Sequence, residues 1–266
     1  MTIAFAAVPE VAQSRADAHP FAIPYAAMNQ KVAHLNFVRK TACHAGWDWG
    51  ICLMPIGVYG RMELRRSALA RTESVQIDQL HENGKVNLVL KTRVHAFDSG
   101  TVSLTHIIDG QTVGGDIEVE KGENLIEHSI TIDSPNLWWP VGQGGQPLYD
   151  LDGETTSQKI GLRKLEWIVE KDEIDHSFKC RINGRDITMM GANWIPADAI
   201  PSRITPEMVE DLLQSAKAAN YNMLRVWGGG QYEPDWFYDL CRRSDRNHPA
   251  GPSAVSPRLH SALVRR

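Results

Sequence analysis

ESVQIDQLHENGKVNLVLKTRVHAF, residues 73–97, is the stretch that decides the fold of the central part of the chain. Two runs in which apolar and polar residues alternate, 73–80 and 85–97, flank the turn His81-Glu82-Asn83-Gly84. Asn-Gly between two alternating runs is the strongest short-range signal of a β-hairpin. The stretch therefore predicts two antiparallel strands joined by a tight turn.

The same alternation continues toward the C-terminus. Residues 102–106 lead into a turn at Asp109-Gly110, and two more strand-like runs follow at 116–119 and 124–132. Several short strands with turns at this spacing are typical of a β-sandwich. We expect a complete, small β-sandwich from about residue 67 to residue 156.

Beyond residue 160 strands begin to alternate with helices. Asn183-Gly184 predicts one more hairpin, and Thr205-Pro206-Glu207 combines an N-cap, a first-position proline and a first-turn acid. The apolar face expected for the helix that follows comprises Met208, Leu212, Leu213, Ala216 and Ala219. The apolar run 222–227 is typical of a buried parallel strand, and a second helix is expected from Pro234 to Cys241. This order predicts the beginning of an α/β fold.

The N-terminal part gives weaker patterns. Residues 1–30 show no clean period and are expected to form a loop or an irregular helix. Residues 36–66 are strand-like, with aromatic residues near Trp47 and Trp49 and glycine turns between them. We expect strands in this second segment.

Composition excludes several classes of protein. Of the 266 residues, 42% are hydrophobic and 23% are charged, which is typical of a globular protein and not of a disordered one. The net charge of −4 argues against nucleic-acid binding, and no apolar run is long enough to cross a membrane. Four scattered cysteines form neither a disulfide framework nor a zinc motif, so we expect a reducing, cytoplasmic location and no metal or cofactor.

The C-terminal segment 242–266 differs from the rest of the chain. It holds six arginines, one acid, three prolines and four serines, and it contains no aromatic residue. Such a segment buries too little apolar surface to offset the entropy of ordering it. We expect it to be disordered; a basic arm for an anionic partner and a tail without function are both open interpretations.

The densest cluster of chemically informative residues is HAGWDWG, residues 44–50. In an extended strand Trp47 and Trp49 share one face and Asp48 points to the other. A carboxylate beside aromatic faces suits a sugar, whose hydroxyls need acceptors and whose C–H faces stack on rings. A core aromatic pair with a surface aspartate explains the same spacing.

Two glycine-containing segments follow expected strands. GANWIPAD, residues 191–198, places Asn193 and Trp194 where they could line a pocket or begin a capped turn. RVWGGG, residues 225–230, ends the expected parallel strand, which is the active-site end of strands in α/β barrels. The glycines do not follow a phosphate-loop pattern, and the chain holds no HExxH or GxSxG motif.

Four segments in order resemble β-mannosidases of glycoside hydrolase family 2. They are RKTACHAGWDWGICLMPIGVYG, LWWPVGQGGQPLY, INGRDITMMGANWIPADAI and NMLRVWGGGQYEPDWFYDLC. The resemblance extends from about residue 20 to residue 241 and implies three domains. Residues 1–66 would be the C-terminal part of a sugar-binding jelly-roll, 67–157 the immunoglobulin-like sandwich, and 158–241 the first strands and helices of an (α/β)8 barrel.

The resemblance also implies a substrate and a site. The family hydrolyses terminal, non-reducing β-D-mannosyl residues with retention, using two glutamates on the barrel. By position, Asp48 and Trp227 would contact the mannosyl unit, and Asn193 and Trp194 would lie nearby. β-Mannosides or manno-oligosaccharides are the implied partners; oligomeric state and the exact glycoside stay open.

The departures from the family pattern are specific. The family's acid/base lies in an Asn-Glu pair, and this chain contains no Asn-Glu dipeptide. After Cys241 the sequence changes abruptly to Arg, Ser and Pro, where the family continues its helix. We therefore expect a chain truncated at both ends, with no catalytic residue of its own and no hydrolytic activity alone. A non-catalytic carbohydrate-binding or interaction module is the alternative.

Overall fold

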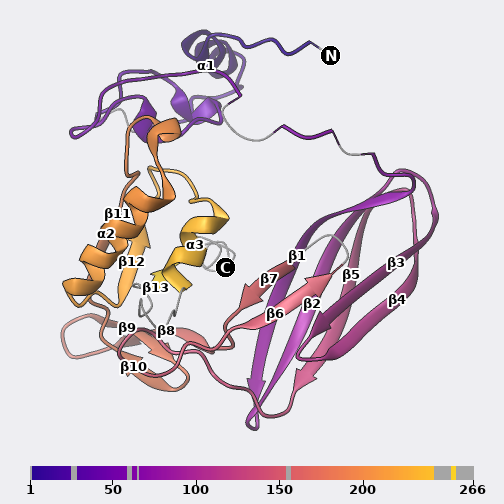
Figure 1. Cartoon of the computed structure of the whole chain (residues 1–266). Helices are drawn as coiled ribbons and strands as arrows, with labels where there is room; N and C mark the ends of the chain where they lie inside the picture. The colour runs from indigo at the N-terminus through magenta and orange to yellow at the C-terminus, as the bar shows by residue number, and fades with distance from the viewer. Residues whose placement is uncertain are drawn as a thin grey trace. The chain divides into compact units, whose positions relative to one another are not determined.

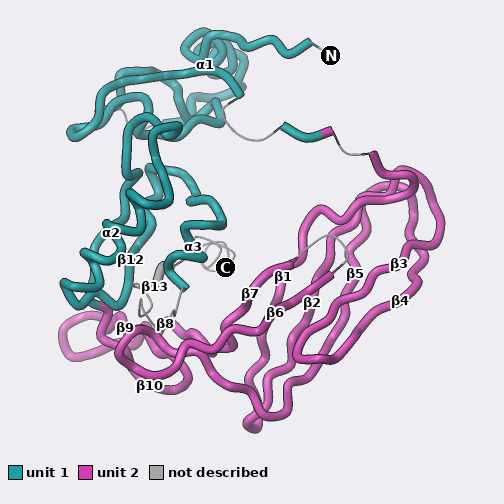
Figure 2. Tube along the Cα trace, viewed as in Figure 1, with its two compact units in different colours: residues 1–63, 190–266 teal, residues 64–189 magenta. Residues whose placement is uncertain are grey.

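A computed structural model describes residues 2–24, 29–58, 62–64, 66–153, 157–242 and 253–255, the last three by their backbone only. The chain divides into two compact units (Figure 2). Unit 1 comprises residues 1–63 and 190–266, and unit 2 comprises residues 64–189. The four domain ranges expected from the sequence divide the chain at other places and stay predictions.

Unit 2 contains a three-stranded antiparallel sheet in the order β1-β2-β5. Its strands are β1 (Ala70–Glu82), β2 (Lys85–Ala96) and β5 (Gly122–Ile132). A second, four-stranded sheet has the order β4-β3-β6-β7 (Figure 1). It is built from β3 (Gly100–Ile108), β4 (Gln111–Val119), β6 (Tyr149–Gly153) and β7 (Ser157–Ile160).

Apolar side chains from both sheets meet in one core. Those from β2 and β5 pack with those from β3 and β6, and the buried members are Val86, Leu88, Leu90, Ile108, Ile130, Ile132, Leu151 and Leu162. Every second residue of β2 is buried between Val86 and Ala96, as the alternation along residues 85–97 predicts. The predicted β-sandwich is therefore confirmed.

Two tight turns of the sandwich have the backbone conformation that their sequences demand. Asn83 and Gly84 have φ of 51° and 75°, and Asp109 and Gly110 have φ of 51° and 71°. A two-residue hairpin turn of this hand requires positive φ at both positions, which Asn, Asp and Gly tolerate best. The local sequence therefore sets the strand register of each hairpin.

A separate three-stranded sheet, in the order β10-β9-β8, completes unit 2. It consists of β8 (Leu165–Lys171), β9 (His176–Ile182) and β10 (Arg185–Ile187). The predicted hairpin at Asn183-Gly184 joins β9 to β10, again with positive φ at both residues. The Asn183 side chain donates a hydrogen bond to the carbonyl of Trp138.

Unit 1 contains a strand–helix–strand motif with parallel strands. β11 (Gly191–Trp194) leads through the short 3-10 helix η3 (Pro201–Arg203) and α2 (Pro206–Ala218) to β12 (Met223–Val226), and α3 (Asp235–Arg242) follows. β11 and β12 pair in parallel with Gly191 opposite Met223. The Thr205 hydroxyl accepts a hydrogen bond from the Met208 amide, which confirms the predicted N-cap.

The buried face of α2 agrees with the expected one only in part, at Leu213. Val209 and Leu213 are 1% and 2% exposed, whereas Met208 and Leu212 are 38% and 40% exposed. Val209 and Leu213 pack against Phe237 of α3 and Leu224 of β12. The sequence shows two overlapping apolar stripes, and only packing against the neighbouring elements selects between them.

The N-terminal part of unit 1 is mostly irregular. It contains one α-helix, α1 (Val8–Asp17), and two 3-10 helices, η1 (Leu35–Phe37) and η2 (Ala42–His44). The strands expected over residues 36–66 do not form in the described part of that range, where Ala45 and Cys52 make an isolated antiparallel bridge. Glycine and proline recur too often there for a continuous ladder.

Most of the expected disordered tail, 243–252 and 256–266, lies outside the described residues. Arg242 ends α3, and Ser253–Val255 form β13, which pairs in parallel with β12. The edge of β12 offers backbone groups with which a strand can pair. The expectation of a disordered tail stays a prediction. No helix among the described residues has the length and apolar character needed to cross a membrane.

Candidate functional site

A tight turn in unit 1 presents the HAGWDWG segment. The Trp47 amide donates to the Gly50 carbonyl at 2.9 Å, and the Gly50 amide donates back to the Trp47 carbonyl at 3.3 Å. The expected extended strand is therefore replaced by a turn, closed at its base by the bridge between Ala45 and Cys52. Asp48 at its tip is exposed, and Trp47 is half-buried.

Trp47 and Trp49 both lie against Trp227, and we call these three residues the tryptophan cluster. The ring centroids of Trp47 and Trp227 are 5.0 Å apart, and those of Trp49 and Trp227 are 6.1 Å apart. Both pairs meet edge to face, the arrangement that the ring quadrupoles favour. The cluster joins HAGWDWG to RVWGGG, two segments far apart in the sequence.

Backbone and side-chain hydrogen bonds hold these two segments together. The Cys43 amide donates to the Gly229 carbonyl at 3.0 Å, and the Thr41 hydroxyl donates to the Gln231 side-chain oxygen at 3.4 Å. A Cβ at Gly229 would lie 2.3 Å from the Trp227 ring. Glycine at this position therefore allows the Trp227 ring to occupy its place in the cluster.

Trp194 lies at the end of β11 with its ring turned into the core of unit 1. It is 9% exposed, and its ring centroid lies 5.0 Å from that of Phe237. The indole nitrogen donates to Glu233 Oε1 at 2.9 Å. Burial raises the pKa of Glu233, and the hydrogen bond from Trp194 partly offsets that increase.

Asn193 points to the other side of β11, as strand geometry requires. Its side-chain oxygen accepts a hydrogen bond from Arg225 Nη1 at 3.0 Å, and the two residues are opposite each other in the parallel register. The neighbouring Trp194 carbonyl accepts from the Trp227 amide at 2.9 Å. The backbone of β11 thus positions Trp227, while the Asn193 side chain pairs with Arg225.

Three acids of unit 1, Asp48, Asp198 and Glu233, have different surroundings. Asp48 is exposed on its turn, and Glu233 accepts from Trp194. Asp198 accepts from the Ile200 amide and forms an ion pair with Arg203 at 3.2 Å. The contacts of Asp198 are those of a turn residue.

Sequence reasoning missed the partners that build this region. The bonds of Thr41 to Gln231 and of Trp194 to Glu233 join residues whose spacing carries no motif. Only the order of segments in related proteins could have indicated that they meet. As for metals, one set of three candidate ligands is present among the described residues, Glu73, His95 and Glu123 of unit 2.

The arrangement suits carbohydrate chemistry. Three aromatic rings offer faces and edges on which sugar C–H groups can stack, and Trp49 is 41% exposed. Asp48, which lies between Trp47 and Trp49 in the sequence, is exposed, and its carboxylate is a hydrogen-bond acceptor for hydroxyl groups. These features combine in the part of unit 1 formed by residues 41–50 and 227–231.

Comparison with known proteins gives two family matches. Residues 1–60 match the family described as "Glycosyl hydrolase 2 galactose-binding domain-like", and residues 70–163 match "Glycosyl hydrolases family 2". Among curated proteins, β-mannosidase B of Emericella nidulans is 33% identical over 226 residues, and β-mannosidase of Bos taurus is 34% identical over 228 residues. These alignments cover 80% and 78% of this chain.

A solved structure agrees with these relatives. The β-D-mannosidase from Dictyoglomus thermophilum matches 88% of this chain with a TM-score of 0.76 and 30% sequence identity, and 30% of that protein is covered. The alignments cover 27% of the Emericella nidulans protein and 26% of the Bos taurus protein, so the chain spans about a quarter of the length of these curated relatives. On these grounds the chain belongs to glycoside hydrolase family 2, and within that family it is similar to β-mannosidases.

Proposed function

We propose that this chain carries part of the sugar-binding surface of a retaining β-mannosidase and does not hydrolyse β-mannosides by itself. The observation that carries the proposal is the tryptophan cluster, which joins the turn at residues 47–50 to Trp227. The similarity to β-mannosidases supports the choice of substrate class.

In this proposal the cluster contacts a terminal β-mannosyl unit. The rings of Trp47, Trp49 and Trp227 stack on C–H groups of the sugar, and Asp48 accepts hydrogen bonds from its hydroxyls. Trp194 supports the cluster through its backbone carbonyl, which accepts a hydrogen bond from the Trp227 amide at 2.9 Å. Asn193 lies one residue away on β11 and would adjoin the same sugar.

The strand–helix–strand motif would be the first unit of an (α/β)8 barrel. Trp194 ends β11 and Trp227 follows β12, so both lie at the C-terminal ends of parallel strands. Catalytic and binding residues of such barrels lie at that end. This placement supports the assignment of residues 158–241 to the start of a barrel, preceded by the sandwich of 67–157 and part of a jelly-roll in 1–66.

The inactivity of the chain by itself follows from the chemistry of retention. Retaining glycosidases need two carboxyl groups about 5–5.5 Å apart, one as nucleophile and one as acid/base. Asp198 is paired with Arg203, Glu233 accepts from Trp194, and Asp48 is exposed on its turn. None of these settings provides the required pair.

Assay of the purified 266-residue chain on an aryl β-mannoside tests the proposal. We expect no release of the aryl alcohol above a boiled control. Release that persists through repeated purification and disappears on Asp48→Ala or Glu233→Gln would overturn the claim of inactivity.

A non-catalytic carbohydrate-binding module is the second candidate, favoured by the exposure of Trp49 and Asp48. It predicts saturable binding of mannobiose in calorimetry, weakened by Asp48→Ala. Asp133→Ala, which removes an exposed aspartate of unit 2, is the matched control and should bind as the wild type does. Absence of any heat at millimolar mannobiose would exclude this candidate.

A further inference from the structure

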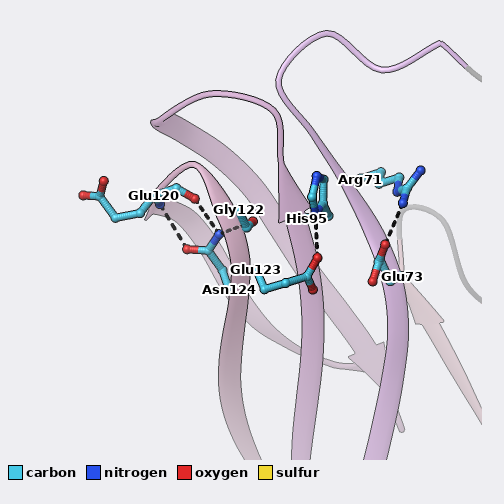
Figure 3. A network of polar contacts seen from close by, with 7 residues as sticks. All are labelled: Arg71, Glu73, His95, Glu120, Gly122, Glu123 and Asn124. Atoms are coloured by element: carbon cyan, nitrogen blue, oxygen red, sulfur yellow. Dashed lines mark hydrogen bonds and ion pairs between the residues drawn. The ribbon is translucent and has the colours of Figure 1, made fainter. Parts of the chain in front are cut away.

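Three potential metal ligands lie close together at one end of the sheet β1-β2-β5 in unit 2 (Figure 3). Glu73 lies on β1, His95 on β2 and Glu123 on β5, so each strand of the sheet contributes one residue. One ligand atom of each residue lies within 4.8 Å of the other two. His95 Nδ1 and Glu123 Oε1 are 2.5 Å apart.

The backbone brings these side chains to the same face. His95 and Glu123 are direct partners in the antiparallel register of β2 and β5. On β1 the register shifts between Thr72 and Ser74, so that Glu73 is the extra residue of a β-bulge. A bulge changes the direction of the side chain that it carries. Both Glu73 and Ser74 are exposed, and Glu73 joins the other two ligands.

Neighbouring groups hold two of the ligands in place. The Asn124 side chain accepts from the Glu120 amide and donates to the Glu120 and Gly122 carbonyls, which fixes the turn leading into Glu123 (Figure 3). The His95 ring meets Phe97 edge to face at 5.3 Å. Such supporting contacts orient ligands before a metal binds.

We propose that Glu73, His95 and Glu123 bind one divalent transition-metal ion of the zinc class. One imidazole and two carboxylates match zinc, whereas magnesium and calcium prefer oxygen ligands alone. Tetrahedral bonds of about 2.1 Å separate ligand atoms by about 3.4 Å. Ligand atoms up to 4.8 Å apart need to close by at most about 1.4 Å, and the His95–Glu123 pair, now 2.5 Å apart, has to open by about 0.9 Å. Side-chain rotation provides movements of this size.

Arg71 acts as a competitor in this site. Its Nη2 lies 2.7 Å from Glu73 Oε1, and its guanidinium lies 5.9 Å from the centre of the Phe97 ring. A metal ion has to displace or share this exposed ion pair, which costs little. Removal of Arg71 should therefore strengthen metal binding.

Zinc binding to the untagged, full-length, metal-free chain tests the proposal by competition with a chromophoric chelator. We expect saturable binding, at least about tenfold weaker in His95→Gln and about two- to fivefold stronger in Arg71→Gln. His176→Gln is the matched control, because His176 also pairs with a carboxylate, Asp175 at 2.9 Å, on the same unit. It should bind zinc as the wild type does.

Two further measurements make the result decisive. Glu123→Gln should weaken binding like His95→Gln, and cobalt added to the wild type should give the visible absorption of a tetrahedral site that both variants lose. Circular dichroism without metal verifies that each variant is folded. Wild-type binding that is not saturable, or equal affinity in His95→Gln, His176→Gln and the wild type, would overturn the proposal.

Discussion

The substitution Gly229→Ala probes the packing of Trp227 directly. A Cβ at this position would lie 2.3, 2.4 and 2.7 Å from three carbons of the Trp227 ring. Non-bonded carbon atoms keep about 3.5 Å apart, so the ring has to move by about 1 Å or the loop has to open. Either movement disturbs the edge-to-face contacts of Trp227 with Trp47 and Trp49.

The expected cost follows from these contacts. Forcing an extra methyl group into a packed site destabilises a protein by about 1–3 kcal/mol. Gly228→Ala is the matched control, because its Cβ would meet no atom within 4 Å. Both substitutions reduce the entropy of the unfolded chain equally, so the difference between them isolates the clash with the ring.

Urea unfolding and near-ultraviolet circular dichroism measure the outcome. We expect Gly229→Ala to unfold unit 1 at a lower urea concentration than Gly228→Ala and to change the aromatic dichroism, whereas Gly228→Ala leaves that spectrum unchanged. Identical spectra and identical unfolding midpoints for the two variants would refute the placement of the Trp227 ring over Gly229.

Three further predictions concern stability. Leu213→Ala should cost about 2–5 kcal/mol in urea unfolding because Leu213 is 2% exposed, whereas Leu212→Ala, at 40% exposed, should cost under about 1 kcal/mol; equal costs would contradict the assigned face of α2. Burial raises the pKa of Glu233, so ionisation of this carboxyl group opposes folding. The wild type should lose stability relative to Glu233→Gln as pH rises above about 4.5. Parallel curves of stability against pH for the two proteins would contradict this prediction. Burial lowers the pKa of His106, so the unfolded chain takes up the proton first as pH falls below about 6.5. The urea concentration at which half of unit 2 is unfolded should therefore decrease between about pH 7 and about pH 5, and it should decrease less steeply in His106→Gln. An equal slope in the two proteins would contradict this prediction.

The sandwich could be predicted because residues close together in the sequence determine its turns and strands. The turns at Asn83-Gly84 and Asp109-Gly110 need positive φ, and their residue types indicate it. The alternating strands between them then have one possible buried face. Helix α2 shows where local information ends, since its N-cap at Thr205 was predictable but its buried face depends on contacts with α3 and β12.

Other elements depend on contacts that no local pattern encodes. The segment around Trp47 has strand-like composition, yet its backbone forms a turn, and the Trp47 ring packs on Trp227. β13 pairs in parallel with the edge of β12, and no pattern in its own sequence predicts a strand. In both cases a distant part of the chain supplies the stabilising partner.

The two sites differ in what the sequence reveals. Asp48 and Trp227 stand in segments that resemble a known family, so the sequence alone is enough to predict a sugar-binding role for them. The set of Glu73, His95 and Glu123 has no motif spacing, because a bulge and a cross-strand register bring its members together. Such a site is visible only in three dimensions.

Nuclear magnetic resonance of the tryptophan indoles tests the central claim most directly. The eight tryptophans give separate signals, and methyl β-mannoside added at millimolar concentration should shift those of Trp47, Trp49 and Trp227. Those of Trp138, Trp139 and Trp167 in unit 2 should stay in place as internal controls. Unchanged signals from the tryptophan cluster, or equal shifts in both groups, would contradict the account.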